Sequence, residues 1–234
     1  MGAIFRREIS SFFTSSIAYV FLAVFYALSG YFFYGTTIYN GITDMSGMFS
    51  NMFMVIVILI PILTMKSFSE EKKQKTEQGL LTAPVSLGGI VLGKYFATVV
   101  MYIMGISIVF VYGLILSCFG EVQWNSVLAN YAALLLLGSA FIAAGILVSS
   151  LTENQVVSAV GSFIVIMLLY LIDAAASFIN IDFISNILRS LSFYTRYYEF
   201  TCGLFNLSSV IFYISAAVIF NFLTIRIFEK RRWS

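Results

Sequence analysis

Long runs of apolar residues, free of Asp, Glu, Lys and Arg, follow one another along the chain. They cover residues 9–43, 45–65, 95–120, 122–152, 154–172 and 200–225. A helix needs about 20 apolar residues to cross about 30 Å of hydrocarbon. Every run except the first fits a single crossing, and the first is long enough to place a further segment elsewhere. The pattern predicts six spans near residues 17–39, 49–66, 95–119, 126–150, 155–177 and 206–227.

Composition supports a membrane protein and excludes other classes. Hydrophobic residues make up 60% of the 234 positions and charged residues 10%, whereas soluble domains are about 25% charged. Disorder is excluded because 24 Phe and 14 Tyr cannot remain solvated. Backbone groups in lipid must be satisfied internally, and these runs are too long for barrel strands. We therefore expect an all-α, polytopic membrane protein with one transmembrane domain over residues 1–234.

The distribution of Lys and Arg predicts the orientation. With six spans, both termini share a side with the loops after spans two and four. That side carries eleven Lys and Arg against two, Arg189 and Arg196, on the other. By the positive-inside rule both termini are cytoplasmic. The basic residues sit at membrane edges, so the net charge of +2 does not indicate a nucleic-acid partner.

The N-terminal segment, residues 1–16, is predicted to form an amphipathic helix on the membrane surface. Its apolar positions fall on one half of a helical wheel and Arg6 and Arg7 on the other, whereas Glu8 breaks the pattern by falling on the apolar half. Two interpretations stay open, a simple membrane anchor and a lever that touches a cytoplasmic partner.

The charged loop between the second and third spans, residues 66–94, predicts a short exposed helix. Ser67 and Glu70 have the spacing of a capping box, and Glu71 and Lys75 that of a favourable i,i+4 pair. Gly79 is a candidate C-cap, Pro84 enforces a turn and Ser86 is placed to cap the helix leading into the third span. A plain connector needs only about 2–8 residues. We therefore favour a docking surface for a soluble protein over a solvated connector.

Gly88 to Lys94 has the G-x-x-x-x-G-K spacing of a phosphate-binding loop. Tyr95 stands where that loop needs Ser or Thr, and no strand precedes it. We expect Gly89 and Gly93 to serve close helix packing instead.

The longer outer segment, residues 176–205, mixes charged and apolar positions. It is predicted to form either short helices that cap a pathway or an interfacial helix anchored by Tyr194, Tyr197 and Tyr198. Asp173 is placed at the outer interface, where a solvated carboxylate is expected rather than a proton relay.

The chain lacks the residue types that several kinds of metal and catalytic site require. The chain has no His and only two Cys, which excludes a zinc or haem site and a His-based triad within it. Cys118 and Cys202 both fall near the outer face, so a disulfide between them stays open. We expect no catalytic residue, cofactor or metal in this chain.

The second loop carries a resemblance to a known family. Its acidic pair Glu70–Glu71, the basic residues that follow, Leu80–Leu81, the Pro84–Ser86 turn and Gly93–Lys94 resemble the permease subunits of type 2 ABC transporters. Within them the chain is most similar to the gliding-motility and copper-site-maturation permeases. The N-terminal stretch 5–9, the polar turn 149–155 and the basic end 229–232 agree. One departure is Lys75, where the family usually has Gly before Thr76.

The resemblance implies a six-helix half-transporter in the bacterial cell membrane, with residues 67–86 as a coupling segment that docks on a separate ATP-binding subunit. Two permeases, identical or related, would pair with two ATPases, which hold ATP and Mg²⁺, and together export a substrate. The docking residues would be Phe68, as an apolar anchor, with Glu70, Glu71, Lys72, Lys73, Lys75 and Glu77, flanked by Arg6, Arg7 and Glu8. The rival hypothesis is a non-transporting scaffold or sensor that recruits cytoplasmic proteins through the same loop.

Overall fold

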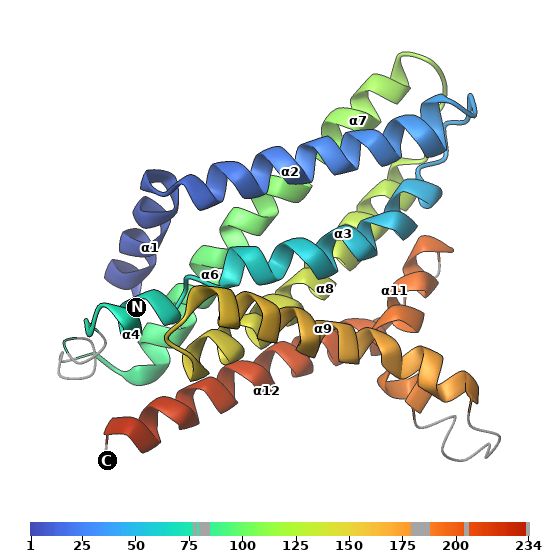
Figure 1. The fold of residues 1–234 in the computed structure, drawn as a ribbon. Helices are drawn as coiled ribbons and strands as arrows, with labels where there is room; N and C mark the ends of the chain where they lie inside the picture. Colours follow the sequence, from blue (N-terminus) through green and yellow to red (C-terminus); the bar gives the residue numbers. More distant parts are fainter. Residues whose placement is uncertain (77–78, 80–84, 179–187, 204–205, 233–234) are drawn as a thin grey trace.

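The computed structural model describes residues 1–76, 79, 85–178, 188–203 and 206–232, and every regular element among them is a helix. Six helical stretches are long and apolar enough to cross a membrane, which confirms the predicted fold class and number of spans. They run over Ser16–Ile38, Ser46–Lys73, Leu87–Ser117, Trp124–Leu151, Gln155–Ala176 and Leu207–Arg232. Figure 1 shows them as a bundle with both termini at one end.

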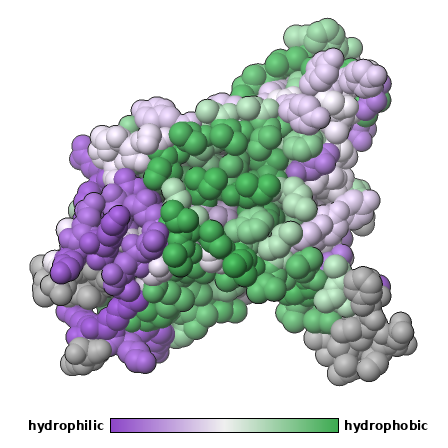
Figure 2. All heavy atoms as spheres, in the orientation of Figure 1, coloured by the Kyte–Doolittle hydropathy of each residue, from purple (hydrophilic) through white to green (hydrophobic). Residues whose placement is uncertain are grey.

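Two short helices lie at that same end, one before the first span and one at the end of the second. Helix α1 (Gly2–Thr14) precedes α2 (Ser16–Phe33), which continues as a π-helical turn, η1 (Tyr34–Ile38). Helix α3 (Ser46–Thr64) is followed by the short α4 (Ser69–Lys73). We call the end of the bundle that holds α1, α4 and both termini the charged end, and Figure 2 shows hydrophilic surface gathered there.

The third span starts where the sequence places the Ser86 cap, but it is divided into two helices. Helix α6 (Leu87–Ile106) ends at Ser107, and α7 (Ile108–Ser117) follows it. The Ser107 hydroxyl donates to the Ile103 carbonyl at 2.6 Å, a bond to the preceding turn of a kind that often bends helices. Ser86 caps α6 as predicted, because its hydroxyl accepts the Gly89 amide at 3.2 Å.

Helix α8 (Trp124–Leu151) lies at the centre of the bundle and packs against α3, α6, α9 (Gln155–Phe178) and α12 (Leu207–Arg232). Small residues on α8 make this possible, as expected for helices that associate within lipid. The Tyr102 ring of α6 lies over Gly138, and the Thr64 side chain of α3 over Gly145. These contacts leave no space for a larger side chain at either glycine.

At the opposite end, helix α11 (Phe193–Thr201) inserts among the ends of α3, α8 and α9. The buried Tyr197 hydroxyl donates to the Phe49 carbonyl at 2.6 Å, so Tyr197 does not anchor α11 at a membrane interface. Asp173 is partly exposed and accepts the Thr195 hydroxyl at 2.5 Å. Cys118 and Cys202 are both free. Residues 179–187 of this segment lie outside the described residues.

Candidate functional site: the charged end

Helix α1 lies against α6 rather than standing apart from the bundle. Its apolar residues Ile4 and Phe12 are buried. A Cβ at Gly93 of α6 would lie 3.1 Å from Ile4 Cγ2, and Gly89 lies beside the first residue of the chain. The Gly89–Gly93 pair is therefore a packing site, as predicted. The apolar face of α1, expected on the membrane surface, is thus covered in part by the protein itself, at Ile4 and Phe12, whereas Phe13 is 40% exposed.

A buried ammonium group joins α1, α4 and α6. Lys94 of α6 is 2% exposed, and its Nζ donates to Glu8 Oε1 at 2.9 Å and to the Ser67 carbonyl at 2.7 Å. Glu71 Oε1 lies 3.1 Å from the same nitrogen. An ammonium has three donors, and here each faces an oxygen. Lys94 thus holds the start of α4 and the middle of α1 against α6, and it is not placed to bind a phosphate.

Arg7 completes this cluster from the solvent side. Its guanidinium pairs with Glu8 at 2.8 Å and also with Glu71, so both carboxylates bridge the same two cations. Burial would raise the pKa of Glu8, but Lys94 and Arg7 outweigh that effect and hold it below its ordinary value. The position of Glu8 on the apolar half of the α1 wheel is thereby explained, because that half faces a buried lysine.

We expect the Glu8 contribution to stability to disappear in acid. Its pKa lies below the ordinary 4.5, so the contribution is fully present above pH 4.5 and is lost as the pH falls through the lower, folded-state pKa. The melting-temperature difference between wild type and Glu8→Gln in detergent should be constant above about pH 5.5 and shrink in more acidic buffer. Glu153→Gln, which removes a surface pair, should show a small difference throughout. A Glu8→Gln difference that grows on acidification would contradict this assignment.

Helix α4 begins without the capping box expected from the sequence. Ser67 Oγ is buried and has no hydrogen-bond partner among the described residues, and α4 starts two residues later, at Ser69. The cap comes from α8 instead, because Ser149 Oγ accepts the amides of Phe68 at 3.1 Å and Ser69 at 3.2 Å. Ser149 also donates to the Met65 carbonyl at 3.2 Å. A hydroxyl distant in sequence thus takes the place of the local one.

Removing this cap should weaken the attachment of α4 to α8. Ser149→Ala leaves two buried amides without their acceptor, and loss of an N-cap costs about 0.5–2 kcal/mol. Ser150→Ala is the matched control, because Ser150 is equally buried but donates only within its own helix, to Leu147. Thermal unfolding in detergent should show a lower melting temperature for Ser149→Ala than for Ser150→Ala. Equal values would show that Ser149 does not cap α4.

Further contacts fix α4 to the remaining helices. Phe68 is 4% exposed and packs on Phe228 of α12, with 4.6 Å between ring centroids. Lys72 pairs with Glu153, in the turn between α8 and α9, at 3.3 Å. Phe68 is therefore not on the surface, where an apolar anchor for a partner would have to be. Its ring packs against α12 inside the protein instead.

The other predicted docking residues divide into inward-facing and exposed sets. Glu70 pairs with Lys66 at 3.1 Å, and Glu71 is engaged in the Lys94 cluster, whereas Lys73 and Lys75 are exposed. The expected pair between Glu71 and Lys75 does not form, because Lys75 has a φ of 58° and turns the chain away after α4. Glycine adopts that backbone conformation most readily. Glu77 and Pro84 lie outside the described residues, and α4 ends before the proposed C-cap Gly79.

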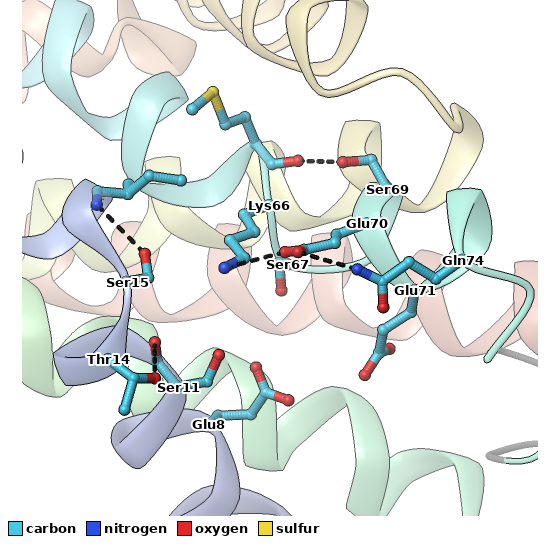
Figure 3. A network of polar contacts seen from close by, with 12 residues as sticks. Glu8, Ser11, Thr14, Ser15, Lys66, Ser67, Ser69, Glu70, Glu71 and Gln74 are labelled. Carbon is cyan, nitrogen blue, oxygen red and sulfur yellow. Dashed lines mark hydrogen bonds and ion pairs between the residues drawn. The ribbon is translucent and has the colours of Figure 1, made fainter.

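A cavity of about 330 Å³ opens between α1 and α4. Its lining includes Glu8 and Ser11 from α1, Lys66 and Ser67 from the end of the second span, and Glu71 from α4. Figure 3 shows the Glu8 and Glu71 carboxylates directed toward the same space from opposite sides, beside the pairs that Glu70 makes with Lys66 and Gln74. Among the described residues, no group of three or more His, Cys, Asp or Glu could hold a metal ion.

The fold and this site define a multi-pass helical membrane protein with a charged helix held between its second and third spans. The chain belongs to the ABC-2 family of transporter proteins, because the model of that family matches residues 3–233. It is thus a membrane permease subunit of an ABC transporter, a class that works with an ATP-binding partner. A comparison with curated proteins found no match.

Proposed function

We propose that this chain is the permease subunit of an ATP-driven exporter, and that α4 with the loop after it couples the bundle to a separate ATP-binding subunit. One observation carries the proposal: α4 continues from α3 and is tied to three further spans. Lys94 links it to α6, Ser149 to α8 and Phe228 to α12. A displacement of α4 would therefore tilt several spans together, as alternating access requires.

The proposed assembly contains two ATP-binding subunits, which hold ATP and Mg²⁺, and a second permease, identical or related. Symmetric pairing of this kind is the ordinary route to a closed oligomer. The charged end would face the cytoplasm with both termini, in a bacterial cell membrane whose lipids surround the spans. Its eleven Lys and Arg support this orientation. Within the family we place the chain in the gliding-motility and copper-site-maturation branch, on the motif from Glu70 to Ser86.

Purification of the tagged chain in mild detergent tests the proposal. We expect a soluble ATPase to co-purify in near-stoichiometric amount, identified by mass spectrometry, and the eluate to hydrolyse ATP. A chain that elutes as a dimer without an ATPase and without activity would contradict the proposal. That result would favour the rival function, a scaffold or sensor that recruits other cytoplasmic proteins through the same loop.

The structure changes the choice of variants for this test. Reversing Glu71 would place a third cation beside Lys94 and Arg7, so lost coupling in that variant would report a damaged permease as readily as a lost partner contact. Reversing Glu70 disturbs only partly exposed contacts, its pair with Lys66 and the hydrogen bond that it accepts from Gln74, and is the safer variant. It should lower ATP-driven transport without lowering the yield of folded permease.

A further inference from the structure

At the charged end the acidic side chains form ion pairs with cations of the same chain. All five glutamates that the structure describes there form ion pairs: Glu8 with Arg7 and Lys94, Glu70 with Lys66, Glu71 with Arg7 and Lys94, Glu153 with Lys72, and Glu229 with Arg226. A carboxylate that lies about 3 Å from a cation contributes little field at a distance, because the two charges cancel there. These glutamates leave little negative charge to attract a partner.

The exposed charges around α1 and α4 that remain are cations. Arg6, Lys73 and Lys75 are exposed, and no ion pair involving them occurs within the part of the chain that the structure describes. Arg7, which bridges α1 and α4, is 52% exposed, but its charge is paired with Glu8 and Glu71 and adds no net positive charge there. The hydrophilic surface at this end in Figure 2 is therefore not neutral in its electrostatic effect.

We propose that the surface of the ATP-binding subunit that receives α4 is acidic, and that Arg6, Lys73 and Lys75 are the residues that recognise it. This rests on the proposed function, and it assigns the partner's chemistry and the contact residues. Complementary charge at the rim of an interface accelerates association and sets orientation. The glutamates of the motif then serve inside the permease, where they hold α4 in place for contact by the cations beside them.

The placement of the three cations distinguishes this surface from a site for anionic lipid headgroups. Lys73 and Lys75 lie at and beyond the end of α4, which residues 65–68 separate from the apolar helix α3, and Arg6 is exposed on α1. Lys230 and Arg232, in contrast, end α12, which continues without a break from its apolar part. The latter pair is in the position expected of a lipid contact, which makes it the matched control.

The test uses the full complex of permease and the ATPase that co-purifies with the wild type. Lys73→Glu with Lys75→Glu should weaken association at least about tenfold at low ionic strength and flatten its salt dependence. Lys230→Glu with Arg232→Glu, which changes net charge equally, should leave association near wild type. Reversal of one acidic residue on the ATPase surface should restore binding to the Lys73/Lys75 variant. Lys73→Gln with Lys75→Gln should give an intermediate loss, which guards against an effect of misfolding.

The outcomes separate this inference from the proposed function. If the wild type retains its ATPase and the Lys73/Lys75 reversal binds it equally tightly, the acidic-surface assignment is wrong while the permease function stands. Equal losses in the Lys73/Lys75 and Lys230/Arg232 variants would reduce the effect to net charge and overturn the assignment as well. Unchanged ATPase binding with weaker binding to vesicles of anionic phospholipid would assign the cations to lipid. Failure of the wild type to retain any ATPase would instead refute the proposed function.

Discussion

Lys94→Met is expected to detach α1 and α4 from α6 and to lower the unfolding free energy by about 3–5 kcal/mol, the usual cost of removing one partner from a buried ion pair. Methionine fills much of the same space but offers no charge to Glu8 and Glu71, which Lys94 contacts at 2.9 and 3.1 Å. Arg7 alone would then face two carboxylates. Denaturant unfolding in detergent measures the loss, and trypsin cleavage after Arg6 and Arg7 should become faster as α1 loosens.

Lys66→Met provides the matched control for Lys94. It makes the same chemical change on the same cavity but removes a partly exposed pair, with Glu70, worth at most about 1 kcal/mol. Comparable losses of stability in the two variants would contradict the role of Lys94 as the link between α1, α4 and α6. In the double variant Glu8→Gln with Lys94→Met, part of the loss should be recovered, because one uncompensated carboxylate is removed.

Gly138→Ala should be nearly as damaging, although it adds a single methyl group. A Cβ at this position would lie 2.3 Å from two ring carbons of Tyr102, which is fully buried and donates to the Leu134 carbonyl at 2.7 Å. Because the ring has no free space to enter, α6 and α8 must separate, and we expect a loss of about 3 kcal/mol. Thermal unfolding in detergent measures it.

A second glycine and a compensating change test the same contact. Gly35→Ala should have little effect, because nothing lies within 4 Å of a Cβ there. Tyr102→Leu should recover part of the stability lost in Gly138→Ala, since it removes the ring that the methyl group meets. If Gly138→Ala and Gly35→Ala melt alike, α6 and α8 do not pack as closely as the structure indicates.

The bundle was predictable because each span is encoded locally. Uncharged runs give the number of spans. Ser86 marks the start of α6 because it caps the amide of Gly89, three residues further along the chain. The break at Ser107 was not predicted, because Ser107 lies within an unbroken apolar run. A hydroxyl in such a run bends the helix only where packing favours the bend, and packing is not visible in one segment alone.

The cluster at the charged end could be predicted only in part, because its contacts join residues far apart in the chain. The position of Glu8 on an apolar helix face indicates a buried partner for its carboxylate. The sequence does not identify Lys94 as that partner. The capping box at Ser67 was wrong because Ser149, more than 80 residues away, takes its place. The sequence has Lys75 where the family usually has glycine. The positive φ of Lys75 shows why glycine is usual at that position.

We propose that the charged end contacts an ATP-binding subunit and transmits that subunit's motion to the spans. Photo-crosslinking in membranes tests this contact, with a crosslinking amino acid at exposed Lys73 and, as control, at exposed Tyr39, which directly follows η1 at the far end of the first span. We expect a crosslink to the ATPase from position 73 only, with a yield that changes when ATP is added. No crosslink from position 73, or equal crosslinks from both positions, would contradict it.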